Sequence, residues 1–207
     1  MFRTLTSLSI LALLASMTVA TPTLAQTDTN EAPVENEDAT GENQLDMGQP
    51  VSDEPALGER YSKEKHGDWD MACIKSEAEV DPCSLLQILK DENGNAVAEM
   101  SLFRLEAGGQ AVAGATMIVP LETLLTARLT IAIDGGPGKQ YQFAYCNPIG
   151  CFANIGLTQA DVDALKRGSS ATVSIVPAPA PDEVIRLPMS LKGFTAGYNV
   201  VDVVANR

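Results

Sequence analysis

Residues 84–104 read SLLQILKDENGNAVAEMSLFR, and this stretch decides the fold class. Two apolar-rich segments, 84–90 and 96–104, flank the turn Asp91-Glu92-Asn93-Gly94-Asn95. Asn-Gly is the dipeptide most typical of a tight β-hairpin, because both of its residues tolerate the positive φ angles that such a turn requires. The stretch therefore predicts two antiparallel strands.

Further segments with the composition of short strands lie on both sides of this hairpin and are separated by turn-forming residues. They span residues 68–74, 111–119, 128–133, 140–146, 151–156, 171–176 and 194–204. Several short strands at near-regular spacing are typical of a β-sandwich or barrel. We therefore predict a single all-β, mainly antiparallel domain over residues 60–207, with a β-sandwich or jelly-roll-like architecture.

One segment, residues 159–167, departs from the strand pattern and predicts a short helix. Thr158 can cap its first turn, Val162 and Leu165 give it an apolar face, and Gly168 can end it. The proline-rich stretch Pro177-Ala178-Pro179-Ala180-Pro181 lacks several backbone donors, so we expect an extended loop or a sheet edge there.

The N-terminus predicts an export signal over residues 1–25. Arg3 is the only charged residue before Asp28, residues 5–15 are mostly apolar, and Thr23-Leu24-Ala25 resembles a signal-peptidase site. The apolar run is far shorter than the ~20 residues that a membrane-spanning helix needs. We therefore expect no transmembrane segment in the mature chain. The expected localisation is the periplasm, reached by the Sec route. Peripheral attachment to the outer membrane and secretion are the alternatives.

Residues 26–59 contain ten acidic residues and no basic one, which predicts a disordered acidic linker. The acidic linker also accounts for most of the formal net charge of −13. From Arg60 onward, 13 basic residues stand against 17 acidic ones. This balance lacks the basic surface that nucleic-acid binding requires, so we expect no nucleic-acid partner.

The chain has four cysteines, Cys73, Cys83, Cys146 and Cys151. An even number in an exported chain is typical of disulfides, and four cysteines allow three pairings. Proximity in the sequence favours Cys73–Cys83 and Cys146–Cys151. The spacings and the single histidine do not fit a zinc site, and the lack of a C-x-x-C motif disfavours a thiol oxidoreductase. We expect no metal and no cofactor.

The sequence contains no complete catalytic motif. His66 is the only histidine, and we interpret it as a surface or cap residue rather than a catalytic base. Ser101 and Ser190 lack the G-x-S-x-G setting of a hydrolase nucleophile. Asp68 and Asp70 are two residues apart, which places both carboxylates on one face of a strand.

Two features have competing interpretations. Trp69 can be an exposed binding anchor, since tryptophan is enriched at interaction hot spots, or a core residue packed near the Cys73 disulfide; we favour the core. The apolar segment 187–194 can bind a partner or close the core.

Several short motifs occur in one order along residues 61–200. They are Gly67-Asp68-Trp69 with Cys73 and Cys83, Ser101-Leu102, Ile118-Val119-Pro120-Leu121, Ile131-Ala132-Ile133-Asp134-Gly135-Gly136, the Cys146–Cys151 loop, and Met189-Ser190-Leu191-Lys192-Gly193-Phe194-Thr195-Ala196. Together they resemble the invasion-associated locus B (IalB) family of exported bacterial proteins. The chain departs from the usual V-P-L-G of this family at Glu122, and its acidic linker lies outside the shared part.

The resemblance implies a β-rich protein of the periplasm or outer membrane, in a family named for host-cell invasion by a pathogen. It brings no catalytic motif. The favoured hypothesis is a non-catalytic envelope protein that binds another envelope protein or a host-surface protein, with host-cell invasion as one biological setting. The alternative is an envelope-acting hydrolase that uses the carboxylates of Asp68, Asp70 or Asp134.

Overall fold

The computed structural model describes residues 46, 48, 50 and 54–205, and all of its helices and strands belong to the unit that begins at Pro50. The expected export signal, residues 1–25, lies outside the described residues, as does most of the acidic linker, residues 26–59. None of the helices in the described part is long and apolar enough to cross a membrane.

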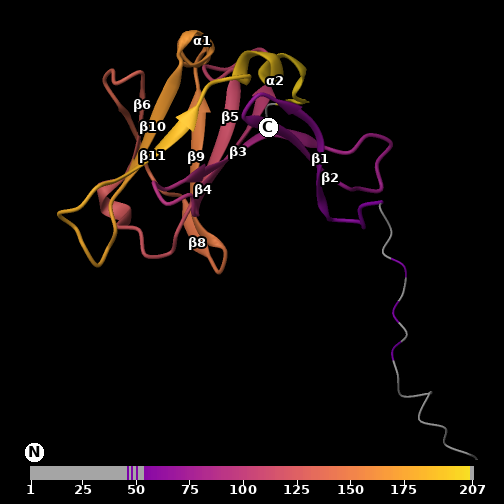
Figure 1. Cartoon of the computed structure of the whole chain (residues 1–207). Coiled ribbons are helices and arrows are strands. Elements are labelled where there is room, and N and C mark those ends of the chain that lie inside the picture. Colours follow the sequence, from indigo (N-terminus) through magenta and orange to yellow (C-terminus); the bar gives the residue numbers. More distant parts are fainter. Residues whose placement is uncertain (1–45, 47, 49, 51–53, 206–207) are drawn as a thin grey trace, which may run out of the picture. The chain divides into compact units, whose positions relative to one another are not determined.

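An eight-stranded sheet forms the larger layer of the domain (Figure 1). Its strand order is β1-β2-β3-β4-β5-β9-β8, with β12 added beside β4. The strands are β1 (Arg60–His66), β2 (Trp69–Ile74), β3 (Cys83–Lys90), β4 (Ala96–Leu105), β5 (Ala113–Val119), β8 (Tyr145–Asn147), β9 (Gly150–Leu157) and β12 (Val203–Val204). All pairs are antiparallel except that of β12, which runs parallel to the end of β4 beyond its last pair with β3.

A four-stranded antiparallel sheet forms the second layer, in the order β11-β10-β6-β7. Its strands are β6 (Leu129–Ile133), β7 (Lys139–Tyr141), β10 (Ser170–Ile175) and β11 (Ile185–Ser190). Three short helices complete the domain: η2 (Leu125–Ala127), α1 (Gln159–Arg167) and α2 (Phe194–Val200). The predicted all-β, mainly antiparallel fold is confirmed.

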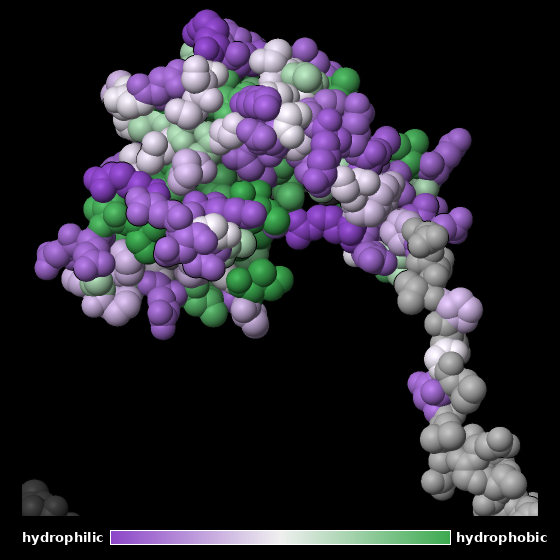
Figure 2. Space-filling view, in the orientation of Figure 1, coloured by the Kyte–Doolittle hydropathy of each residue, from purple (hydrophilic) through white to green (hydrophobic). Residues whose placement is uncertain are grey.

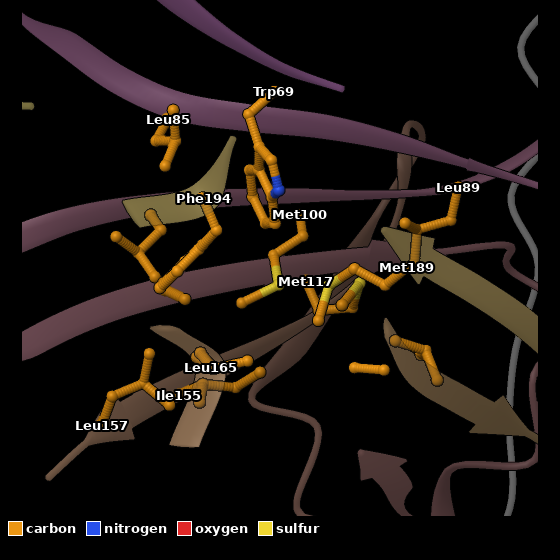
Figure 3. Close-up of a cluster of buried hydrophobic side chains, with 14 of the residues drawn as sticks. Trp69, Leu85, Leu89, Met100, Met117, Ile155, Leu157, Leu165, Met189 and Phe194 are labelled. Atoms are coloured by element: carbon orange, nitrogen blue, oxygen red, sulfur yellow. The ribbon is translucent and has the colours of Figure 1, made fainter. Parts of the chain in front are cut away.

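One hydrophobic core takes side chains from both sheets and from α1 and α2 (Figure 3). Its largest fully buried members include Trp69, Leu85, Met100, Met117, Leu187, Met189 and Phe194. The buried amide of Gln87 links the sheets: its Nε2 donates to the Ser190 carbonyl, and its Oε1 accepts the Ser190 N–H. Because a buried amide without partners would cost free energy, these bonds fix how β3 faces β11.

The predicted hairpin forms between β3 and β4, but its turn is not the tight Asn-Gly turn that the sequence indicated. The last strand pair is Lys90 with Ala96, and of the two residues Asn93 and Gly94 only Gly94 has a positive φ. Asp91 accepts the backbone N–H groups of Asn93 and Asn95, and Gly94 adopts the left-handed φ that the turn needs. The predicted helix also forms. Thr158 and Asp161 make reciprocal capping bonds at its start, and Val162 and Leu165 are buried.

The predicted strand at 194–204 is wrong for most of its length, because residues 194–200 form helix α2. Phe194, Gly197, Tyr198 and Val201 recur at helical spacing, and all four are buried. Gly197 permits the close packing of α2 on β3, since a Cβ there would stand 2.4 Å from Leu85 Cδ1. The domain therefore has two α-helices where the sequence predicted one.

Three further differences concern strands. The predicted strand 140–146 is two short strands in different sheets, β7 and β8, since the chain crosses between the layers at 142–144. Strands β1 and β11 were not predicted. β1 carries four charged residues and β11 contains Pro188, features that sheet edges tolerate.

The structure contains two disulfides, Cys73–Cys83 and Cys146–Cys151. Each joins residues that are directly opposite on neighbouring antiparallel strands. On the chain-entropy model, a disulfide that closes a loop of this length stabilises the folded state by roughly 2–3 kcal/mol, because it lowers the entropy of the unfolded chain.

Asp81 anchors the loop that the Cys73–Cys83 disulfide closes. Its carboxylate accepts hydrogen bonds from the Ser76 backbone N–H, the Tyr61 hydroxyl and the Lys75 ammonium group. These donors, the Ser76 N–H first, lower the pKa of Asp81 from its ordinary 3.8 to about 2. Since charged acceptors hold such donors more strongly than neutral ones, the loop depends on ionised Asp81.

We expect the Asp81 contribution to stability to be complete above pH 4 and to be lost as the pH falls from about 4 toward 2. The sign follows because the unfolded state takes up the proton first, at its higher pKa. Urea unfolding of the wild type and of Asp81→Asn between pH 2 and pH 7 checks this, and the variant should show a flatter profile. Parallel profiles would contradict it.

Candidate functional site

The outer face of the eight-stranded sheet is unusually apolar. In a sheet with one face in the core, alternate residues on the opposite face are normally polar. Here the outward positions of β2, β3, β5 and β9 include Ile74, Leu86, Ile88, Ile118 and Phe152. Figure 2 shows hydrophobic atoms gathered at the end of the domain where β8 lies in Figure 1. We call this surface the outer apolar face.

Two hollows lie on the outer apolar face, with volumes of about 530 and 350 Å³. The ion pair between Arg60 of β1 and Glu99 of β4, with an Nη1–Oε1 distance of 2.7 Å, borders both. The larger hollow is lined by Ile88, Val97, Ile118, Pro120, Ile149 and Phe152. The face therefore combines an apolar surface with charged groups that can orient a partner.

The β8–β9 hairpin forms one end of the larger hollow and presents Ile149, which is 77% exposed. The Cys146–Cys151 disulfide closes the hairpin, and the Ile149 N–H donates to Asn147 Oδ1 within its turn. Tyr145, 53% exposed, stacks on Phe152 with ring centroids 4.7 Å apart. The exposed isoleucine thus stands on a braced turn, so a partner that binds it orders little additional chain.

The sequence did not identify the outer apolar face as a site. The sequence does contain a pattern that points to this face, because segments such as 84–90 have apolar residues at both inward and outward positions. That pattern is also typical of a strand covered on both faces. Only the structure separates the two cases: Ile74 and Ile88, at outward positions of β2 and β3, are 48% and 49% exposed, whereas Leu86 and Phe152 are nearly buried by their neighbours.

Trp69 belongs to the core, as favoured from the sequence, and the interpretation as an exposed anchor is wrong. It is 1% exposed, and its Nε1 donates to the Ser190 carbonyl at 2.8 Å. Its ring packs edge-on against that of Phe194, with ring centroids 5.3 Å apart. The segment 187–194 likewise closes the core, through β11 and the first residue of α2.

The three candidate carboxylates do not form a common site. Asp68 and Asp70 line one wall of a broad cleft of about 820 Å³, whereas Asp134 lines a different cavity. The Asp68 carboxylate accepts a hydrogen bond from the Ser190 hydroxyl, and that of Asp70 accepts one from the Ser62 hydroxyl.

Asp134 and His66 both lie in places where they contribute to the fold. The Asp134 carboxylate accepts the backbone N–H groups of Ser169 and Ser170, which joins the end of β6 to the start of β10. His66 is mostly buried rather than at the surface, and its Nε2 has no hydrogen-bond partner among the described residues, with the Glu64 carboxylate 3.7 Å away. In the same part of the chain, no group of three or more His, Cys, Asp or Glu could hold a metal ion.

A family model described as "Invasion associated locus B (IalB) protein" matches residues 69–202. The chain belongs to the IalB family. Among solved structures, it is similar to invasion associated protein B from Bartonella henselae, with 24% sequence identity and a TM-score of 0.55. The alignment covers 66% of this chain and 92% of that chain, and at this identity it shows a shared fold. A search of curated proteins found no match.

The IalB match places the site within the family domain. The matched residues include both disulfides, the braced turn with Ile149, and Glu99 of the bordering ion pair. Arg60 and the rest of β1 precede them. Strand β1 forms one edge of the eight-stranded sheet and contributes the cation that borders both hollows.

Proposed function

We propose that this IalB protein is a non-catalytic protein of the bacterial envelope that binds an apolar segment of another exported protein. The observation that carries the proposal is the outer apolar face, with Ile149 on its disulfide-braced turn. In this proposal the domain acts in the periplasm after Sec export, and peripheral contact with the outer membrane arises through the partner. The similar protein from Bartonella henselae is named as invasion associated, and host-cell invasion is one use of such binding.

A protein partner suits the composition of this face. Protein interfaces have an apolar centre, enriched in aromatic side chains, and a polar border that fixes orientation. Ile88, Ile149 and Phe152 supply the apolar centre, and the Arg60–Glu99 pair supplies bordering hydrogen-bond groups. An apolar side chain from the partner would fill the larger hollow beside the braced turn.

Replacing Ile149 with aspartate is expected to weaken capture of the partner by about 30-fold, the effect of losing a 2 kcal/mol hot spot. The mature protein, attached to a resin, is incubated with envelope extract, and the bound proteins are quantified by mass spectrometry. Val80→Asp is the matched control, because Val80 is 70% exposed in the loop between β2 and β3 and lines neither hollow.

A photoreactive amino acid at position 149 should crosslink to the same protein, whereas one at position 80 should not. Equal recovery of every captured protein by wild type and Ile149→Asp would refute the proposed face. A partner lost with Val80→Asp as well would show that any added charge prevents binding, and would also count against this site.

A further inference from the structure

A separate cavity of about 330 Å³ lies between the two sheets, against helix α1. Ile131 and Ile133 of β6 line one side of it. Its most deeply buried lining residues, which Figure 3 labels within the core, are Met100, Leu157, Leu165 and Met189. Methionine side chains are flexible and polarisable, so this lining can adapt its shape to an apolar guest.

The cavity reaches the surface at the turn between β6 and β7, since Gly136 and Pro137 line it and are exposed. Three polar side chains, those of Lys139, Tyr141 and Asp161, also line it. The Lys139 ammonium group donates to the Asp161 carboxylate. The Tyr141 hydroxyl makes no hydrogen bond to any described residue, so it is available to a ligand.

We propose that this cavity binds an uncharged, single-chain amphiphile, with its alkyl chain between the sheets and a hydroxyl or ester headgroup beside Tyr141. A volume of about 330 Å³ holds about ten heavy atoms at about 30 Å³ each, the share that a water molecule occupies in the liquid. An apolar cavity with a few convergent polar groups is the usual form of a small-molecule site.

The charges around the cavity select an uncharged headgroup. Lys139 and Asp161 neutralise each other, and Asp134 adds one negative charge. A carboxylate headgroup would face two carboxylates. A cationic headgroup would have to compete with Lys139 for Asp161, and with the Ser169 and Ser170 N–H groups for Asp134. A hydroxyl group can accept from Tyr141 and donate to Asp161. Burial raises the pKa of Tyr141, which keeps its hydroxyl a protonated donor at neutral pH.

Calorimetric titration of the mature protein with three ten-carbon probes tests the headgroup. We expect 1-decanol to bind at least about tenfold more tightly than decanoate or decylammonium, one factor of ten being the effect of a single hydrogen bond or ion contact. Absence of 1-decanol binding would overturn the proposal. Equal or tighter binding of either ionic probe would overturn its assignment to an uncharged ligand.

A series from 1-hexanol to 1-dodecanol tests the enclosed chain. Affinity should rise by about fourfold for each methylene, the transfer free energy of a buried CH₂ group, and should stop rising near ten carbons, where the cavity is full. A continued rise to 1-dodecanol would indicate adsorption to an open surface instead. This series uses the wild-type protein, so its result does not depend on the folding of a variant.

Ala164 and Ala160 provide a matched pair of substitutions on helix α1. Ala164 lines the cavity, whereas Ala160 is exposed and does not. Ala164→Leu should fill part of the cavity and weaken 1-decanol binding at least about tenfold, the loss of nearly two buried methylene groups. Ala160→Leu should bind as the wild type does. Unchanged binding by Ala164→Leu, with a wild-type circular dichroism spectrum, would overturn the proposal. The outer apolar face is unaltered by either change, so this test is independent of partner binding.

Discussion

Replacing Trp69 with alanine is expected to lower the free energy of unfolding by about 3–5 kcal/mol, the range for removing a large aromatic side chain from a core. The substitution removes the edge-on contact with Phe194 and the hydrogen bond from Nε1 to the Ser190 carbonyl. It thereby weakens the junction of β2, β11 and α2. Urea unfolding, followed by far-UV circular dichroism because Trp69 is the only tryptophan, measures the loss.

Trp69→Phe is the matched control. It keeps an aromatic ring against Phe194 and removes the indole N–H, so its loss should be less than half that of the alanine variant. The Ser190 carbonyl retains its bond from Gln87 in both variants. A loss below about 1 kcal/mol for Trp69→Ala, the size of an ordinary substitution, would show that the indole does not hold the two sheets together.

Gly193→Ala is expected to destabilise the domain by about 2–5 kcal/mol, the sum of a left-handed backbone penalty and an overpacking penalty. Gly193 has φ 87°, and a Cβ there would stand 2.0 Å from the His66 carbonyl oxygen. The turn after β11 crosses the turn after β1 at this point, where the Asp68 N–H donates to the Lys192 carbonyl at 3.1 Å. An added methyl group must push two backbones apart and move the start of α2.

Gly94→Ala separates the two causes. Gly94 has nearly the same φ, 86°, but a Cβ there would meet nothing within 4 Å. Its substitution should cost only the backbone penalty of about 1–2 kcal/mol. Chemical denaturation of both variants gives the comparison, and equal losses would mean that the crossing of the two turns tolerates a side chain.

The two proposed sites use different parts of the sandwich. The outer apolar face lies on the side of the eight-stranded sheet that points away from the core, whereas the 330 Å³ cavity lies between the sheets. Ile149→Asp and Ala164→Leu therefore alter different sites. A variant that loses its partner but keeps 1-decanol binding, and a second with the reverse behaviour, would show that the domain carries two separate functions.

Short-range features of the sequence were enough to predict the β3–β4 hairpin, helix α1 and the family. The turn between 84–90 and 96–104 indicates a hairpin from its own residues, because Asp91 accepts the N–H groups of Asn93 and Asn95 and Gly94 supplies the positive φ. The cap and apolar spacing at 158–168 specify α1 in the same way. The ordered motifs of residues 61–200 were enough to indicate the IalB family, which the family model confirms.

The features that depend on contacts between residues far apart in the chain could not be predicted from the sequence. Residues 194–200 contain strand-forming and helix-forming signals together, and burial of Phe194 against Trp69, with Gly197 on Leu85, selects the helix. The apolar residues at outward positions of β3 and β9 are compatible with a covered sheet or an open one. Whether the face is covered or open depends on how the two sheets pack, and that packing joins residues far apart in the chain. The candidate binding face and the cavity are therefore properties of the assembled sandwich. The sequence predicted strands β3, β5, β6 and β9, which line them, but it did not predict β1 and β11, which contribute Arg60 to the face and Met189 to the cavity.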